Sequence, residues 1–290
     1  MSDDTTVPFL FPAVGRKKVT AAFDGGRLTS DGGVMLLAAA ERRLGIAQRL
    51  APLIADPRNP LLVTHSIADI LRARMLAIAC GYEDADDLDH LRTDPGFKLA
   101  CGRLPDSGRD LCSQPTVSRW ENAPSLREVM RMTYAMVDIY CASYPRPPAA
   151  VTLDIDDTVD VVHGHQQLSL FNGHYDGYCY LPLYLCGSID GGPAYVIGAL
   201  LRDGLAVAPE GACAMLRRVV KAIRARYPAV EIIIRGDGGF GVPEMLTFCH
   251  EQQLLFCFGK PQNARLHALS ERYQRWAALR WSQTKQAHRE

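Results

Sequence analysis

Two short acidic stretches set the architecture of this chain, residues 153–158 (LDIDDT) and residues 232–240 (IIIRGDGGF). Each places an aspartate at the end of an apolar, β-branched run, which is how a buried strand delivers a carboxylate to the edge of a sheet. Strand side chains alternate between faces, so Asp154 and Asp156 point one way and Asp157 points the other. Carboxylates that a fold brings together bind hard divalent cations such as Mg²⁺. The two stretches therefore predict a cation site if the fold places them side by side.

The second half of the chain is predicted to contain strands and helices in a defined order. Strands are expected over residues 151–162, 180–188, 194–201, 231–235 and 254–259, and helices over 212–227 and 243–253. Residues 189–193 (IDGGP) suit a hairpin turn between the second and third strands. Three strands followed by helix and strand in alternation indicate an α/β layer structure with right-handed crossovers. That order matches the ribonuclease H-like fold, a mixed β-sheet flanked by helices, whose first and fourth strands are neighbours. Asp156 and Asp237 would then meet.

The first half is predicted to be helical. Apolar residues recur at helical spacing in residues 34–44, 65–80 and 126–140, and the acidic run 83–89 introduces a further short helix. The run 145–148 (PRPP) breaks the chain and is the best candidate for a domain boundary. The predicted organisation is an arm (1–24), a helical DNA-binding region (25–148), a ribonuclease H-like catalytic domain (149–265) and a basic tail (266–290).

The amino-acid composition limits the kinds of protein that this chain can be, but it does not identify a binding partner. Apolar residues make up 48% of the 290 residues, and lysine plus arginine equals aspartate plus glutamate at 32 each, so net charge neither predicts nor excludes a nucleic-acid partner. The nine cysteines form no CxxC pair, which favours reduced thiols in a cytosolic protein over disulfides or a zinc site. No signal-like start and no apolar run of membrane-spanning length is found. We expect a cytoplasmic protein without a membrane partner.

Each candidate aspartate also has a structural interpretation. A carboxylate on a strand can pair with an arginine, and Asp-Gly-Gly is ordinary turn chemistry in which the aspartate caps a backbone amide. Arg235 could hold a phosphate or neutralise the neighbouring acids, and neutralisation is the more frequent use. Acids at the ends of two adjacent strands nevertheless favour metal binding over a purely structural use.

One segment of the helical half has the composition of a DNA-recognition helix. Residues 114–120 (QPTVSRW) place a proline in the first turn, and their polar or basic side chains are of the kind that reach base edges or phosphates. These candidate DNA-binding residues are Gln114, Thr116, Ser118 and Arg119. The alternative is a capped helix of a helical domain, with Trp120 in its core.

Several blocks together resemble the DDE transposases of bacterial insertion sequences, and more narrowly the group named for insertion sequence thirteen-eighty. The resemblance covers nearly the whole chain. Its most specific part is the block from Phe171-Asn172-Gly173 to Leu181-Pro182-Leu183-Tyr184. The other matching blocks are residues 31–33 (DGG), 113–119 (SQPTVSR), 156–158 (DDT), 235–240 (RGDGGF), 258–259 (FG) and 263–266 (NARL).

The resemblance implies a catalytic site in which three acids hold two Mg²⁺ ions. Its first acid falls on Asp156 and its second on Asp237, with Asp154 as a same-face neighbour that could assist or substitute. Its third acid is a glutamate on a late helix within an E-N-x-I-K-like stretch, and this sequence has no such stretch. The expected protein is therefore a truncated, catalytically impaired copy of the transposase.

The implied partners are double-stranded DNA, as terminal inverted repeats and as target, and a further copy of the chain through self-association. The implied location is the nucleoid-associated cytoplasm of a bacterium. Two alternatives remain open. One is a ribonuclease H-like nuclease acting on structured nucleic acid. The other is a non-catalytic DNA-binding regulator derived from a transposase.

Overall fold

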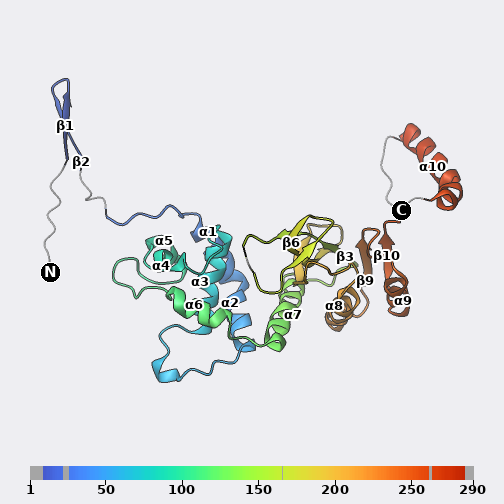
Figure 1. Cartoon of the computed structure of the whole chain (residues 1–290), viewed down its shortest axis with the longest axis horizontal. Helices are drawn as coiled ribbons and strands as arrows, with labels where there is room; N and C mark the ends of the chain where they lie inside the picture. The colour runs from blue at the N-terminus through green and yellow to red at the C-terminus, as the bar shows by residue number, and fades with distance from the viewer. Residues whose placement is uncertain (1–8, 22–25, 165, 261–262, 285–290) are drawn as a thin grey trace. The chain divides into compact units, whose positions relative to one another are not determined.

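The computed structural model describes residues 9–21, 26–164, 166–260 and 263–284, which are coloured in Figure 1. The chain divides into two compact units, Met1–Ala135 and Met136–Glu290. The division falls within α7 (Leu126–Ala142). Parts of all four segments predicted from the sequence lie outside the described residues: 1–8 and 22–24 of the arm, 25 of the helical region, 165 and 261–262 of the catalytic domain, and 285–290 of the tail.

The first unit contains a hairpin and a set of mostly short helices. β1 (Phe9–Val14) pairs antiparallel with β2 (Lys17–Ala21). The helices in chain order are α1 (Val34–Leu44), α2 (Ile46–Leu50), η1 (Ala51–Leu53), η2 (Pro60–Leu62), α3 (Ile67–Ala79), α4 (Leu88–Leu91), α5 (Pro95–Ala100) and α6 (Gln114–Glu121). A buried apolar cluster that includes Val34, Ile70, Leu88, Phe97 and Val117 joins α1, α3, α4, α5 and α6. The helices predicted over residues 34–44 and 65–80 are confirmed.

A buried glutamate links two of these helices. α1 ends where Gly45 takes the left-handed conformation, at φ 64°, which a residue with a side chain seldom adopts. The carboxylate of Glu41, 6% exposed, then accepts hydrogen bonds from the amides of Ile46 (3.0 Å) and Ala47 (2.9 Å). Glu41 thus satisfies the otherwise unpaired amides that open α2.

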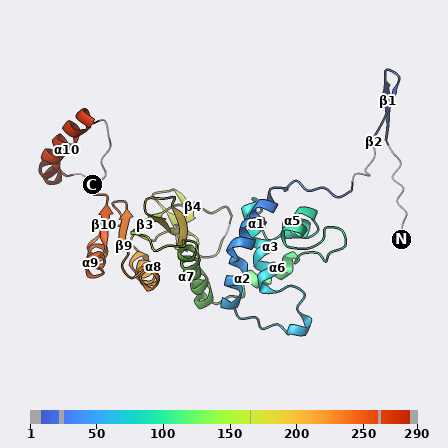
Figure 2. The same ribbon diagram turned by 180° about the vertical axis from the view of Figure 1, so that it is seen from behind.

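The second unit is built on a five-stranded mixed sheet. Its strands are β3 (Ala150–Asp157), β7 (Leu183–Ile189), β8 (Tyr195–Leu200), β9 (Glu231–Gly236) and β10 (Leu255–Phe258), in the order β10-β9-β3-β7-β8. β3 pairs antiparallel with β7 and parallel with β9. The crossover helices α8 (Ala212–Arg226) and α9 (Pro243–Glu251) lie beside β9 and β10 in both views (Figure 1 and Figure 2). The predicted ribonuclease H-like order, with the first strand next to the fourth, is confirmed.

The two faces of this sheet differ in burial. Val151, Leu153 and Ile155 are at most 1% exposed and lie on the face that packs against helices. On that face Tyr140 of α7 lies within van der Waals distance of a methyl group built on Gly187, and Met215 of α8 approaches Gly198 in the same way. The opposite face carries half-buried or exposed side chains, among them Thr152, Asp154, Asp156, Ile233 and Arg235.

The structure corrects two predicted strands. The first strand ends at Asp157, and the second does not begin until Leu183, because Pro182 has no amide to donate to a ladder. Of the remaining residues of those predicted strands, 160–161 and 180 belong to a separate antiparallel sheet, which also contains residues that were not predicted as strand. Its strands are β4 (Asp160–Val161), β5 (Leu170–Asn172) and β6 (Gly177–Tyr180), in the order β4-β6-β5. Strands this short carry too little pattern to be recognised from sequence.

After β10, α10 (Ala264–Thr284) occupies most of the predicted basic tail. Within the described residues, no helix combines the length and apolarity that crossing a lipid bilayer requires.

Candidate active site

The register between β3 and β9 brings two of the predicted acids to one edge of the sheet. Asp154 pairs with Arg235, and Ile155 with Gly236. Asp156 is the next residue of β3, and Asp237 is the first residue after the end of β9. Since adjacent strands lie about 4.8 Å apart, the register places the backbones of Asp156 and Asp237 next to each other at this edge of the sheet. Asp156 is also two residues beyond Asp154, and therefore on the face that carries the Asp154–Arg235 pair.

Both aspartates are exposed, and each has one oxygen held by a backbone amide. Asp156 Oδ1 accepts from the amide of Asp157 at 3.0 Å, and Asp237 Oδ1 accepts from the amide of Gly239 at 2.9 Å. Within the described part of the chain neither carboxylate takes part in an ion pair. Each therefore has its second oxygen available, and the pair offers the oxygen ligands that Mg²⁺ prefers. The two carboxylates fit such an ion only as a pair of ligands, and the described residues include no group of three or more His, Cys, Asp or Glu side chains that could hold a metal ion.

Asp154 is held by Arg235. The guanidinium donates to both carboxylate oxygens, Nε to Oδ1 at 2.6 Å and Nη2 to Oδ2 at 2.7 Å. This hydrogen bonding raises the pKa of Arg235 above its ordinary value. Of the two uses considered for Arg235, the structure displays neutralisation of an acid, and that acid is Asp154.

Asp157 points to the other face and meets Arg202, a residue whose role the sequence alone does not indicate. Arg202 is 7% exposed, and its Nη2 donates to Asp157 Oδ2 at 2.6 Å. Its Nε donates to the carbonyl of Leu181 at 2.7 Å, and its Nη1 donates to carbonyl oxygens of Val207, Ala208 and Glu210. The only signal in the sequence is a lone arginine directly after an apolar strand, which does not reveal its partners.

The turn that carries Asp237 is packed from three sides. Phe240 is fully buried, and the amide of Gly259, just after β10, donates to the carbonyl of Gly236 at 3.2 Å. Lys260 Nζ donates to the carbonyl of Gly241 at 2.6 Å. On the remaining side the backbone at Gly239 approaches Ala208 so closely that an added methyl group would lie 2.8 Å from the Ala208 Cβ. These contacts fix the direction in which Asp237 leaves the sheet.

The predicted DNA-binding side chains lie on α6, in the first unit. Asp89 Oδ1 accepts from the amide of Gln114 at 3.1 Å, and Pro115 occupies the first turn, so the helix begins as predicted. Thr116 and Arg119 line a cavity of about 420 Å³, whereas Gln114 and Ser118 do not.

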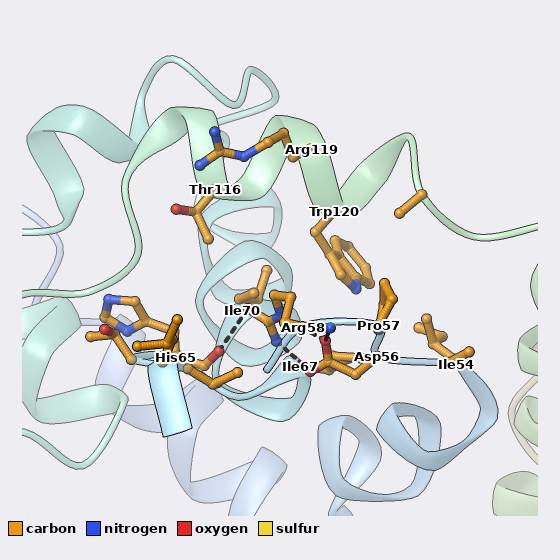
Figure 3. Close-up of a pocket in the computed structure, with 15 residues that line it drawn as sticks. Ile54, Asp56, Pro57, Arg58, His65, Ile67, Ile70, Thr116, Arg119 and Trp120 are labelled. Atoms are coloured by element: carbon orange, nitrogen blue, oxygen red, sulfur yellow. Dashed lines mark hydrogen bonds and ion pairs between the residues drawn. The ribbon is translucent and has the colours of Figure 1, made fainter. Parts of the chain in front are cut away.

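Trp120 extends from α6 into the same cavity, toward Pro57 and Arg58 (Figure 3). It is half-buried and packs against the apolar cluster of the first unit. Its indole Nε1 is buried without a hydrogen-bond partner among the described residues. The structure thus leaves Arg119 exposed on the helix and places Trp120 partly in the core, as the alternative interpretation of this helix expected.

Comparison with known proteins gives one family match and several structural matches of low sequence identity. Residues 11–290 match the model of the family described as transposase DDE domain group 1. A solved piggyBac transposase synaptic complex with hairpin DNA is 14% identical with a TM-score of 0.34, over 82% of this chain and 53% of that chain. A pre-cleavage Mos1 transpososome is 12% identical with a TM-score of 0.25, over 91% of this chain and 87% of that chain. The chain thus spans about half the length (53%) of the piggyBac protein. No curated protein matches it.

The family match runs through the strands that carry Asp156 and Asp237 and through the helical unit before them. This chain belongs to the transposase DDE domain family, group 1.

Proposed function

We propose that this protein acts on the DNA ends of an insertion sequence, as a transposase whose Asp156 and Asp237 hold divalent cations, Mg²⁺ in the cell. The observation that carries the proposal is the register of β3 and β9, which sets two exposed carboxylates without ion-pair partners among the described residues at one sheet edge. A cation bound there supplies a lowered pKa for the attacking oxygen and charge stabilisation for the leaving oxygen of a phosphodiester. In this proposal Asp156 and Asp237 bind the cation and orient it. The amides of Asp157 and Gly239 hold the Oδ1 atoms of these two aspartates by hydrogen bonds.

The DNA partner is proposed to contact α6. Arg119 is exposed on that helix, and Thr116 lies one turn earlier beside the same cavity. Gln114 and Ser118 complete the polar set, with both side chains half-buried. Arg235 is committed to Asp154 and is expected to neutralise that acid instead of contacting phosphate.

We also propose to which group of transposases the chain belongs and how active it is. The block from Phe171 to Tyr184 supports membership of the group named for insertion sequence thirteen-eighty. Among the described residues no third acid joins Asp156 and Asp237. The family mechanism needs three acids, and two carboxylates hold a cation less firmly than three do. We therefore propose that this polypeptide alone cleaves DNA weakly.

The test uses the full chain with duplex DNA that ends in a terminal inverted repeat. We expect a gel shift with repeat DNA, together with little Mg²⁺-dependent nicking of the same duplex. An Arg119→Ala variant should bind the DNA more weakly, because a phosphate or base-edge contact is lost. Absence of any preference for repeat DNA would contradict the proposed partner. Robust nicking that disappears in Asp237→Asn would show that the chain is catalytically competent and would overturn the predicted impairment.

A second candidate function is a DNA-binding regulator that occupies transposon ends without cutting them. The arrangement of two acids without a third among the described residues favours it. Unchanged DNA binding in Asp156→Ala, with no nicking by the parent chain under any divalent cation, would support the regulator over the enzyme.

The ion pair of Asp154 yields a separate prediction. Asp154→Asn removes the partner of a half-exposed arginine, so we expect the free energy of unfolding to change by less than about 1 kcal/mol. Mn²⁺ affinity should fall only modestly, because an unpaired Arg235 repels the cation without removing a ligand. Thermal unfolding and Mn²⁺ titration followed by electron paramagnetic resonance measure the two quantities. A loss of affinity equal to that of Asp237→Asn would instead make Asp154 a ligand.

A further inference from the structure

Arg202 contacts both of the chain segments that support the acid pair, although the proposed chemistry does not use it. Its guanidinium reaches Asp157 at the end of β3 and the carbonyl oxygens of the 207–210 segment. We propose that Arg202 is a positioning residue that fixes the separation of Asp156 and Asp237, and thereby the affinity of this pair for a divalent cation. The inference rests on the proposed function of that pair.

The first connection runs from Arg202 to Asp156. Arg202 Nη2 holds Asp157 Oδ2 at 2.6 Å, and Asp157 is the last residue of β3. The amide of Asp157 in turn donates to Asp156 Oδ1 at 3.0 Å. Arg202 therefore restrains the peptide unit whose N–H orients the Asp156 carboxylate.

The second connection runs from Arg202 to Asp237. Arg202 Nη1 donates to the carbonyls of Val207 and Ala208, each at 2.9 Å, and so holds this segment in place. The segment packs against the turn after β9, because a methyl group on Gly239 would meet the Ala208 Cβ at 2.8 Å. The amide of Gly239 donates to Asp237 Oδ1 at 2.9 Å. Each acid is thus oriented by one amide, and Arg202 supports the segment behind each amide.

The chemistry of arginine suits this task and that of lysine does not. A buried charge is tolerated when it is paired and its hydrogen bonds are satisfied. Arg202 is 7% exposed and donates from all three nitrogens, to one carboxylate and to four carbonyl oxygens. A lysine carries the same charge on a single nitrogen and cannot span Asp157 and the 207–210 segment at once.

A positioning role and a purely electrostatic role of Arg202 predict opposite changes in cation affinity when Arg202 is replaced. If Arg202 acted on the site only through its charge, its removal would leave Asp157 unpaired and would raise affinity for a cation. An Arg202→Lys change, which keeps the charge, would then have no effect. If Arg202 positions the acids, both variants weaken cation binding because the geometry loosens.

The experiment measures Mn²⁺ binding to the full chain by electron paramagnetic resonance, with circular dichroism as a check of folding. For Arg202→Met and Arg202→Lys we expect Mn²⁺ affinity to fall about tenfold or more, the size typical of residues that orient metal ligands. The matched control is Arg74→Met. Arg74 also joins one carboxylate, that of Glu121, to backbone carbonyls, but it lies in the first unit. Its variant should bind Mn²⁺ as the parent chain does.

A second arm leaves Arg202 untouched and covers the case in which its variants do not fold. Gly239→Ala should weaken Mn²⁺ binding, since the new methyl group would lie 2.8 Å from the Ala208 Cβ. The same methyl group would lie 3.2 Å from Asp237 Oδ1, so adding Ala208→Gly should restore the part of the affinity that is lost through the clash with Ala208. Rescue in the double variant supports the second connection.

The outcomes separate this inference from the proposed function. Parental affinity in folded Arg202→Lys, or a rise in Arg202→Met, would overturn the positioning role while leaving the Asp156–Asp237 site intact. Parental affinity in Gly239→Ala would overturn it as well. A parent chain that binds no Mn²⁺ would overturn the proposed site and this inference together.

Discussion

Asp237→Asn is expected to lower the affinity of the full chain for Mn²⁺ by about 100-fold or more. The change replaces a charged ligand with a neutral one in a pair that has no third described acid to compensate. Loss of a direct ligand should exceed the roughly 10- to 100-fold typical of residues that only orient a ligand. Asp156→Asn should behave in the same way, because both carboxylates leave adjacent strands at the same edge. Titration of Mn²⁺ into protein, with free ion detected by electron paramagnetic resonance, gives the dissociation constants.

The matched control for this prediction is Glu231→Gln. Glu231 is exposed on β9 at the end opposite to Asp237, where it pairs in register with Ala150. The substitution removes one negative charge from the same strand without touching the proposed ligands. Equal losses of affinity in Glu231→Gln and Asp237→Asn would mean that Mn²⁺ responds to overall charge, and the assigned site would be wrong.

Phe240→Ala is expected to lower the free energy of unfolding of the second unit by about 3–5 kcal/mol, the usual cost of removing a buried phenylalanine. Phe240 is fully buried and follows the Asp237 turn directly, with its Cβ 3.3 Å from the position of a methyl group on Gly236. Its removal leaves a cavity under the turn, so Mn²⁺ binding should weaken even where the unit remains folded. Chemical denaturation followed by circular dichroism measures the stability.

Phe256→Ala provides the comparison for this second prediction. Phe256 lies on β10 and is 47% exposed, so its truncation should cost less than about 2 kcal/mol. The contrast isolates burial, since residue type and chemical change are the same. Similar destabilisation by the two variants would show that Phe240 does not anchor the turn.

The adjacency of β3 and β9 could be predicted because each strand has a recognisable local sequence pattern. Both are β-branched runs that end in an aspartate, and the order of strands and helices leaves few ways to pair them. The register that brings Asp156 level with Asp237 then follows from placing two acid-bearing ends at one edge. The sequence also indicated that α6 begins near Pro115, because a proline in the first turn is a local signal.

Other features could not be predicted because they depend on tertiary neighbours. Arg202 and Asp157 are 45 residues apart, and the remaining partners of Arg202 are carbonyl groups, which leave no trace in side-chain chemistry. The same holds for the bidentate pair of Asp154 and Arg235. The alternation of side chains along β3 predicts on which face of the sheet Asp154 lies, but it does not predict that Arg235 is its partner. The cavity beside Trp120 arises from residues 54–70 meeting α6, and no single stretch of sequence encodes it.

The parallel pairing of β3 with β9 has a consequence for biosynthesis. Asp154 and Arg235 are 81 residues apart, so a chain emerging from the ribosome displays β3 long before its second neighbour exists. Contacts of such separation form late, because a long loop must close first. Until then the central strand has one unpaired edge, and a partner chain or chaperone could occupy it. The two aspartates can therefore come together only after residues 150–237 have been synthesised and β9 has paired with β3.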